Sequence, residues 1–156
     1  MEMNKNMLII AHRGNVFGSN PQRENTISYI NEALNFGFCV EVDVWYDADT
    51  DFLWLGHDSP QYKITCDFLK NDKIWCHAKN RSALEYMIAN NIHCFWHETD
   101  KYTITNKGYI WCYSGNYSRL GVTVDLTDSV GFLGKDIFGI CTDIPNKWKE
   151  FLTNDK

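Results

Sequence analysis

The 156-residue sequence has no apolar run close to the roughly 20 residues that a membrane-spanning helix needs. The apolar stretch Met7–Ala11 is also shorter than the core of a secretory signal, which takes about 7–15 residues. We therefore expect a cytoplasmic protein without stable membrane insertion. Positive charge is scarce as well. The net charge of −5 argues against a broad nucleic-acid-binding face, although it permits one small basic pocket.

Several motifs with well-defined chemistry are missing too. The sequence contains no G-x-S-x-G, no P-loop and no G-x-G-x-x-G, which disfavours a metal-free lipase and a nucleotide-binding module. None of the six cysteines forms a C-x-x-C pair, so neither a zinc ribbon nor a redox motif is expected. Most of them lie in apolar runs, which predicts buried, reduced thiols. No repeat or linker divides the chain, so we expect a single domain over residues 1–156.

Short apolar runs recur along the chain and alternate with helix-like segments. Strands are predicted at residues 7–11, 38–46, 52–56, 73–79, 92–98, 109–113, 122–126 and 138–144. Helices are predicted at residues 25–37, 65–71, 82–91 and 145–152, the first with Asn25 or Thr26 as its N-cap. This alternation favours parallel pairing. It predicts an α/β fold, a compact (β/α)8 TIM-type barrel with some outer helices shortened or missing, because such barrels usually have about 250 residues. An open α/β sheet is the structural alternative.

Polar residues gather where these strands end. In a parallel barrel, reactive groups meet at the carboxyl ends of the strands. Glu41 and Asp43 alternate with valines and therefore share one face of their strand, although periodicity leaves open whether that face points inward or to solvent. If the face points inward, the two like charges need a compensating cation, and a divalent metal such as Mg²⁺ or Ca²⁺ is the simplest one. The other strand-end residues are His12, Arg13, His57, His77, Lys79 and Glu98.

Together these residues indicate a phosphate-ester site. A metal would polarise a phosphoryl oxygen, while Arg13 and Lys79 would hold the negative charge. One histidine would accept a proton and another would donate one. Each motif taken alone is equally compatible with an ordinary turn or a structural side chain, so this interpretation rests on their combination.

The stretches IAHRGN, RENTISYINEAL, GFCVEVDVWYD and LWLGHD, in that order, resemble the glycerophosphodiester phosphodiesterases. That family belongs to the phospholipase-C-like phosphodiesterase barrels. The shared signatures are His-Arg-Gly, Glu-Asn-Thr, Glu-x-Asp and His-Asp, within roughly the first third of the chain. The resemblance implies a TIM barrel and a metal-dependent phosphodiester hydrolase, in which a neighbouring glycerol hydroxyl or water attacks the phosphorus. The chain is shorter than the family's usual barrel, which favours a small, water-soluble phosphodiester over a membrane lipid.

The resemblance also implies roles for individual residues. His12 and His57 match the catalytic histidines, with His12 as the base and His57 as the acid, or the reverse. Glu41 and Asp43 match the metal-binding carboxylates. The residues expected to bind the substrate are Arg13, Glu24, Asn25, Lys79 and Glu98.

One departure from the family pattern affects the metal. The family usually has Glu-x-Lys on the fourth strand, whereas this chain has His77-Ala78-Lys79. We expect His77 to be the third ligand, with Glu98 as another source of the missing carboxylate. An imidazole removes one negative charge and softens the site, so the metal would bind more weakly, differ in identity or be absent.

Two alternatives to the hydrolase stay open. A catalytically degenerate barrel would bind a phosphorylated small molecule without turnover. An unrelated small α/β domain would carry the His-Arg-Gly run by accident. The sequence identifies neither the alcohol on the phosphodiester nor the oligomeric state.

Overall fold

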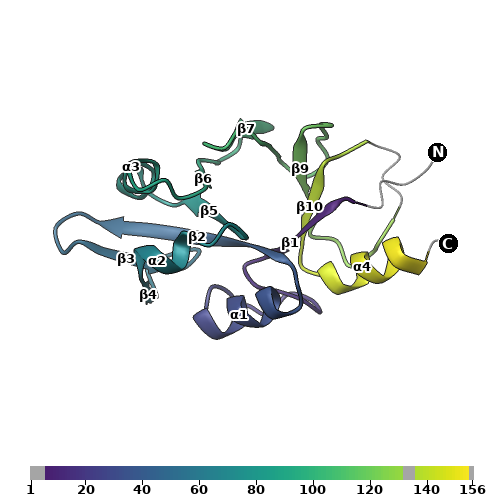
Figure 1. The fold of residues 1–156 in the computed structure, drawn as a ribbon, viewed down its shortest axis with the longest axis horizontal. Helices are drawn as coiled ribbons and strands as arrows, with labels where there is room; N and C mark the ends of the chain where they lie inside the picture. Colours follow the sequence, from purple (N-terminus) through teal and green to yellow (C-terminus); the bar gives the residue numbers. More distant parts are fainter. Residues whose placement is uncertain (1–5, 132–135, 155–156) are drawn as a thin grey trace.

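The computed structural model describes residues 6–131 and 136–154, which form a curled, mixed sheet with helices packed on its outer side (Figure 1). The strands are β1 (Leu8–His12), β2 (Cys39–Asp47), β3 (Phe52–Leu55), β4 (Tyr62–Ile64), β5 (Ile74–Ala78), β6 (Cys94–Phe95), β7 (Tyr102–Ile104), β8 (Ile110–Cys112), β9 (Gly121–Val124) and β10 (Gly139–Thr142). The helices are α1 (Ile27–Asn35), α2 (Cys66–Leu69), α3 (Arg81–Ala89) and α4 (Pro145–Asn154).

The parallel part of the sheet follows the order β6–β5–β2–β1–β10–β9–β8. The predicted α/β class and curved parallel sheet are therefore confirmed. The prediction of a complete (β/α)8 barrel is not. The described part of the chain has seven parallel strands, and no ladder joins β6 to β8.

The run at residues 52–56, predicted as a barrel strand, belongs instead to a hairpin. β3 pairs antiparallel with β2, with Val44 opposite Leu55. Only residues 48–51 connect the two strands, whereas a parallel crossover needs about a dozen residues or more. Val44 is the last residue of β2 that pairs with β5, and β2 continues beyond it. The hairpin then returns along β2, so that Leu55 at the end of β3 lies opposite Val44.

A side chain and an aromatic stack span the gap between β6 and β8. Asn106, in the turn between β7 and β8, bonds through its backbone N–H to the carbonyl of Cys94 and through its side chain to the N–H of Cys94 and the carbonyl of Ile92. Inside the sheet, the rings of Phe95 and Trp111 stack with their centroids 4.3 Å apart. The sheet therefore has a filled interior and not an open channel.

Side chains alternate between this interior and the outer surface of the sheet. One buried cluster fills the interior and comprises Ile10, Trp75, Phe95, Trp111, Val122 and Cys141. Val40, Val42 and Val44 point the other way, into a second cluster beneath α1 and α3. Thr26, one of the two predicted caps, begins α1 by accepting a hydrogen bond from the N–H of Tyr29.

The six cysteines are all free thiols: Cys76, Cys94, Cys112 and Cys141 are buried, whereas Cys39 and Cys66 are partly exposed. Within residues 6–131 and 136–154, no helix combines the length and apolar character that crossing a bilayer requires.

Candidate active site

The two carboxylates of β2 point into the interior of the curled sheet, near the carboxyl ends of the neighbouring parallel strands β1 and β5. The valines between them occupy the outer face, so period-two geometry turns Glu41 and Asp43 inward. Glu41 is 3% exposed and Asp43 is 1% exposed. The sequence left the orientation of this face open, and the structure buries it.

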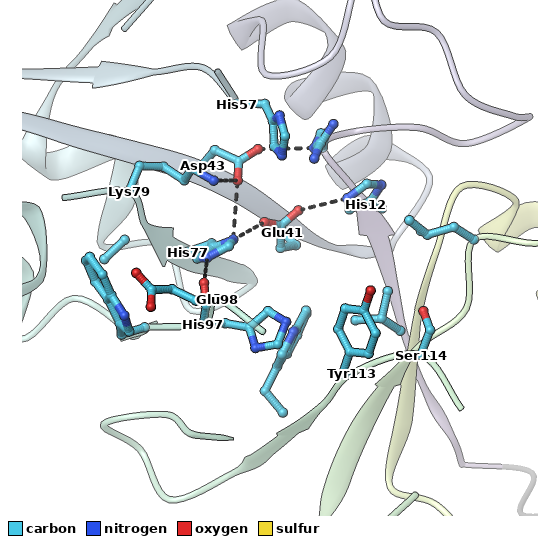
Figure 2. Close-up of a pocket in the computed structure, with 16 residues that line it drawn as sticks. His12, Glu41, Asp43, His57, His77, Lys79, His97, Glu98, Tyr113 and Ser114 are labelled. Atoms are coloured by element: carbon cyan, nitrogen blue, oxygen red, sulfur yellow. Dashed lines mark hydrogen bonds and ion pairs between the residues drawn. The ribbon is translucent and has the colours of Figure 1, made fainter. Parts of the chain in front are cut away.

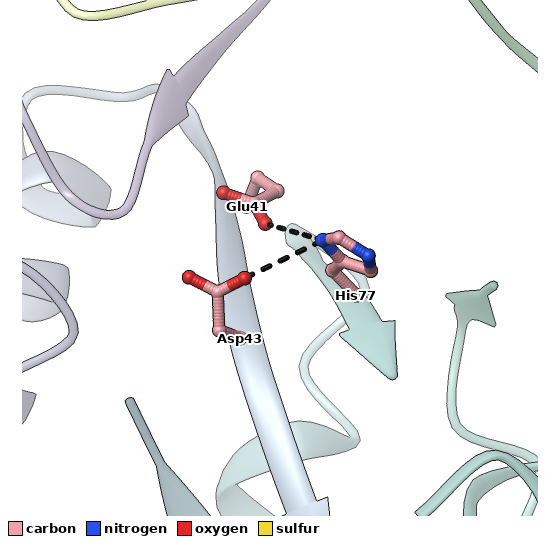
Figure 3. Close-up of side chains that lie close together, drawn as sticks. All are labelled: Glu41, Asp43 and His77. Atoms are coloured by element: carbon pink, nitrogen blue, oxygen red, sulfur yellow. Dashed lines mark ion pairs between the residues drawn. The ribbon is translucent and has the colours of Figure 1, made fainter. Parts of the chain in front are cut away.

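His77 lies directly across the ladder from Asp43, because β5 pairs with β2 in that register. Its Nδ1 is 3.4 Å from Asp43 Oδ1 and 3.9 Å from Glu41 Oε1 (Figure 3). One potential ligand atom from each of the three residues lies within 4.8 Å of the others. The three side chains therefore form a compact group that could hold a metal ion.

Two buried oxygens of this group have no hydrogen-bond partner, namely Glu41 Oε2 and Asp43 Oδ1. Leaving a buried charged oxygen unsatisfied is costly, so buried carboxylates are normally paired or bound to a cation. Carboxylate oxygens and imidazole nitrogen are ordinary ligands of divalent metals. The residues present therefore fit the divalent ion that the sequence predicts.

The carboxyl group of Asp43 is held by cationic and amide groups on three sides. Arg13 Nε lies 3.1 Å from Oδ2, and Lys79 Nζ lies 4.0 Å from Oδ1. Asn25 donates from Nδ2 to Oδ2 at 2.9 Å and accepts the N–H of Asp43 at 3.0 Å. Burial opposes ionisation, but His77, Arg13 and Asn25 outweigh it and hold the pKa of Asp43 far below its usual value. Asp43 is therefore ionised at neutral pH.

Glu41 has no comparable partner. Its nearest basic groups are the imidazoles of His12 and His77, each 3.9 Å away. Burial and the neighbouring charge of Asp43 raise the pKa of Glu41. A cation bound at this position would therefore favour the ionised form of Glu41.

His12 ends β1 and is oriented by a residue from the far end of the chain. Its Nδ1 hydrogen-bonds to Asp143 Oδ1 at 2.7 Å, and its Nε2 points toward Glu41 (Figure 2). Asn15 also donates to Asp143 Oδ1, at 2.9 Å. Burial lowers the pKa of His12, but the hydrogen bond to Asp143 and the charge of Glu41 outweigh it and raise the pKa above its usual value. The pKa of Asp143 is lowered correspondingly, despite its burial.

Arg13 reaches the same group from a strained backbone. Its φ of +53° lies in the left-handed region, which side chains other than glycine rarely adopt. Its N–H donates to the carbonyl of Glu41, and its Nη1 donates to Glu24 Oε2 at 3.1 Å. Glu24 also accepts hydrogen bonds from Asn15 and Ser19. These contacts hold the guanidinium beside Asp43.

His57 enters from the hairpin, immediately after β3. Gly56 donates its N–H to the carbonyl of Asp43 and accepts from Trp45 Nε1. A Cβ on Gly56 would lie 2.0 Å from the carbonyl oxygen of Ser59, so only glycine fits this turn. The His57 ring is 44% exposed, and its Nδ1 is 2.8 Å from Asp58 Oδ1.

A single cavity of about 450 Å³ joins these groups (Figure 2). Its polar lining comprises His12, Arg13, Glu41, Asp43, His57, His77, Lys79, His97, Glu98 and Ser114. Its apolar wall comprises Ala78, Trp96, Trp111, Tyr113, Val124 and Leu126. The predicted histidines, acids and bases of the separate strand ends thus converge on one cavity.

Two predicted placements differ from those observed. Glu24 and Asn25, expected to bind the substrate, do not line this cavity. Glu24 accepts a hydrogen bond from Arg13, and Asn25 donates one to Asp43. Glu98, predicted among the substrate-binding residues, lines the cavity, and of the two candidates for the third metal ligand the group contains His77 and not Glu98.

Sequence reasoning gave no role to two residues that orient the site, Asp143 and Asn15. Asp143 directly follows β10, within the apolar run at residues 138–144 that was predicted as a strand. No local signal marked it, because its place depends on the pairing of β10 with β1: Thr142 lies opposite Ala11, so Asp143 is level with His12.

The fold is similar to that of a solved structure described as a glycerophosphodiester phosphodiesterase from Parabacteroides distasonis ATCC 8503. The TM-score is 0.59 over 96% of this chain and 98% of that chain, at 15% sequence identity. At this identity the likeness establishes the fold alone. No protein-family model and no curated protein matches the sequence.

Proposed function

We propose that the protein is a metal-dependent phosphodiester hydrolase that acts on a small glycerophosphodiester. The observation that carries the proposal is the convergence of two histidines, two buried acids and two cationic side chains on one cavity. The fold likeness to a glycerophosphodiester phosphodiesterase supports it.

Arg13 and Lys79 are the phosphate-binding groups. Both line the cavity beside Asp43, and a guanidinium and an ammonium supply the hydrogen-bond donors that a phosphodiester anion requires. Glu24 and Asn25 act as positioning residues, because they fix the guanidinium of Arg13 and the carboxylate of Asp43.

Glu41, Asp43 and His77 are the residues that would hold the divalent ion. When bound, the ion would polarise a phosphoryl oxygen and neutralise the charge that develops there.

His12 is the general base in this proposal. Asp143 accepts the Nδ1–H, which leaves the Nε2 lone pair facing the cavity. Nε2 takes the proton of the attacking hydroxyl, either a glycerol hydroxyl of the substrate or water, as the new P–O bond forms. His57, oriented by Asp58, donates a proton from Nε2 to the leaving alkoxide as the old P–O bond breaks.

Release of phosphomonoester from glycerophosphodiesters, followed by ³¹P NMR, tests the proposal. The assay compares Mg²⁺, Ca²⁺, Mn²⁺ and Zn²⁺ with a chelated sample. We expect metal-dependent turnover by the wild type, and loss of about 10²-fold or more in His12→Ala and Glu41→Gln. Glu85→Gln provides the matched control, because Glu85 is an exposed residue of α3 that pairs with Arg81.

Three outcomes separate the functions. Turnover lost in both site variants, with circular dichroism unchanged, supports the hydrolase. Phosphodiester binding without turnover for every metal identifies the degenerate barrel instead. Equal loss in Glu85→Gln, or neither binding nor turnover, contradicts any phosphodiester role.

A further inference from the structure

The candidate metal group contains a nitrogen donor. Glu41 and Asp43 supply oxygen atoms, whereas His77 supplies a ring nitrogen from the neighbouring strand. Imidazole is a common ligand of Zn²⁺, Cu²⁺, Fe²⁺ and Ni²⁺, whereas Mg²⁺ and Ca²⁺ are held almost entirely by oxygen atoms. The donor set therefore differs from the all-oxygen set that would favour Mg²⁺ or Ca²⁺.

The orientation of the His77 ring points its nitrogen toward a metal. Nε2 lies 2.9 Å from the backbone carbonyl of His97, an atom that only accepts, so Nε2 carries the hydrogen. When a metal binds, the neutral ring presents the Nδ1 lone pair on the side of Glu41 and Asp43, in place of the Nδ1–H that otherwise faces Asp43 (Figure 3). A metal-binding histidine usually donates its other N–H to a carbonyl or carboxylate in this way. Phe95 stacks against the ring and fixes its plane.

The charge around the group disfavours binding by electrostatics alone. Two cationic side chains, Arg13 and Lys79, lie 3.1 Å and 4.0 Å from oxygens of Asp43. They offset the two negative charges that Glu41 and Asp43 contribute when ionised. A hard ion depends mainly on that negative charge, whereas a borderline ion gains additional affinity from the imidazole.

We infer that this site selects a borderline transition-metal dication of the Fe²⁺-to-Zn²⁺ series over Mg²⁺ and Ca²⁺, with His77 Nδ1 as its nitrogen ligand. The inference deepens the proposed function, because it names the class of ion in the same site. Glu41 Oε2 and Asp43 Oδ1, which are buried and have no hydrogen-bond partner, support the presence of an ion here, because a bound cation would satisfy them.

Electron paramagnetic resonance of Mn²⁺ added to the purified protein tests the inference without any substrate. Pulsed spectra report ¹⁴N coupling when an imidazole binds the ion, and competition with Mg²⁺, Ca²⁺ and Zn²⁺ gives relative affinities for this site. We expect ¹⁴N coupling in the wild type. We also expect Zn²⁺ to bind at least ~10-fold more tightly than Mg²⁺ or Ca²⁺ and to displace Mn²⁺ from the site.

His77→Glu and His77→Gln are the test variants, and His57→Asn is the control because His57 lines the cavity outside the metal group. Both His77 variants should lose the ¹⁴N coupling, and His77→Glu should reduce the ratio of Zn²⁺ affinity to Mg²⁺ affinity at least ~10-fold. His57→Asn should keep both properties. If His77→Glu fails to fold, the wild-type spectrum and His77→Gln decide the question.

Wild-type protein that binds no Mn²⁺, shows no ¹⁴N coupling or prefers Mg²⁺ or Ca²⁺ overturns the inference. Loss of coupling in His57→Asn, with coupling kept in His77→Gln, assigns the nitrogen to His57 and also overturns it. If the proposed function is wrong but this inference is right, Mn²⁺ binds through His77 and the protein cleaves no phosphodiester. If the inference is wrong but the proposed function is right, the protein hydrolyses phosphodiesters with Mg²⁺ and shows no ¹⁴N coupling.

Discussion

Replacing Asp143 with asparagine tests whether the hydrogen bond to Asp143 orients His12 and raises its pKa. The substitution keeps the size of the side chain and an acceptor oxygen, but it removes the charge from the 2.7 Å hydrogen bond to His12 Nδ1. A hydrogen bond to a charged group contributes about 1.5–3 kcal/mol, which corresponds to a loss of about 10- to 150-fold in kcat/KM. Because Asp143 raises the pKa of His12, Asp143→Asn should also lower the His12 pKa measured by NMR in the metal-free protein.

Asp125→Asn is the matched control for this variant. Asp125 follows β9, the strand beside β10, but its carboxylate accepts hydrogen bonds from Thr127 and does not line the cavity. Phosphodiester hydrolysis by Asp125→Asn should match that of the wild type. The reasoning is refuted if Asp143→Asn retains full kcat/KM and an unchanged His12 pKa, or if the two variants lose activity equally.

Two further predictions concern the framework. Gly56→Ala should destabilise the fold by more than the roughly 1 kcal/mol expected for Gly108→Ala, and should also reduce hydrolysis by displacing His57. Both glycines have positive φ, but a Cβ on Gly56 would meet a carbonyl oxygen at 2.0 Å, whereas a Cβ on Gly108 would meet nothing within 4 Å. Urea unfolding checks this, and equal costs would contradict it. Burial and Lys107 lower the pKa of His93 from 6.5 to about 4, so its contribution to stability is complete above pH 6.5 and is lost as the pH falls toward 4. The free energy of unfolding should fall by about 3 kcal/mol more in the wild type than in His93→Gln over that interval, and parallel pH profiles would refute the linkage.

The local parts of this site could be predicted from the sequence, because they depend on short-range geometry. Because Glu41 and Asp43 alternate with valines, the sequence predicted that both acids share one face of their strand. It did not predict whether that face points inward or to solvent. The direction itself depended on the packing of those valines under α1 and α3, which period two does not encode. His12 and Arg13 were found because a buried strand ends there.

The long-range parts could not be predicted in the same way. The contact between His12 and Asp143 joins residues 131 positions apart and follows from the pairing of β1 with β10. The number of parallel strands was overestimated because an apolar run such as residues 52–56 does not reveal the direction of its strand. The connection at residues 48–51 was the better signal, because it is too short for a crossover. β7 was missed because its residues are largely exposed and carry no apolar run.

A crystal structure of the protein soaked with Mn²⁺ and glycerol 3-phosphate would test the central claim most directly. The account predicts the ion on Glu41, Asp43 and His77, with the phosphoryl group within hydrogen-bonding distance of Arg13 and Lys79. A phosphoryl group bound elsewhere, while these side chains retain their present contacts and hold no ion, would contradict it.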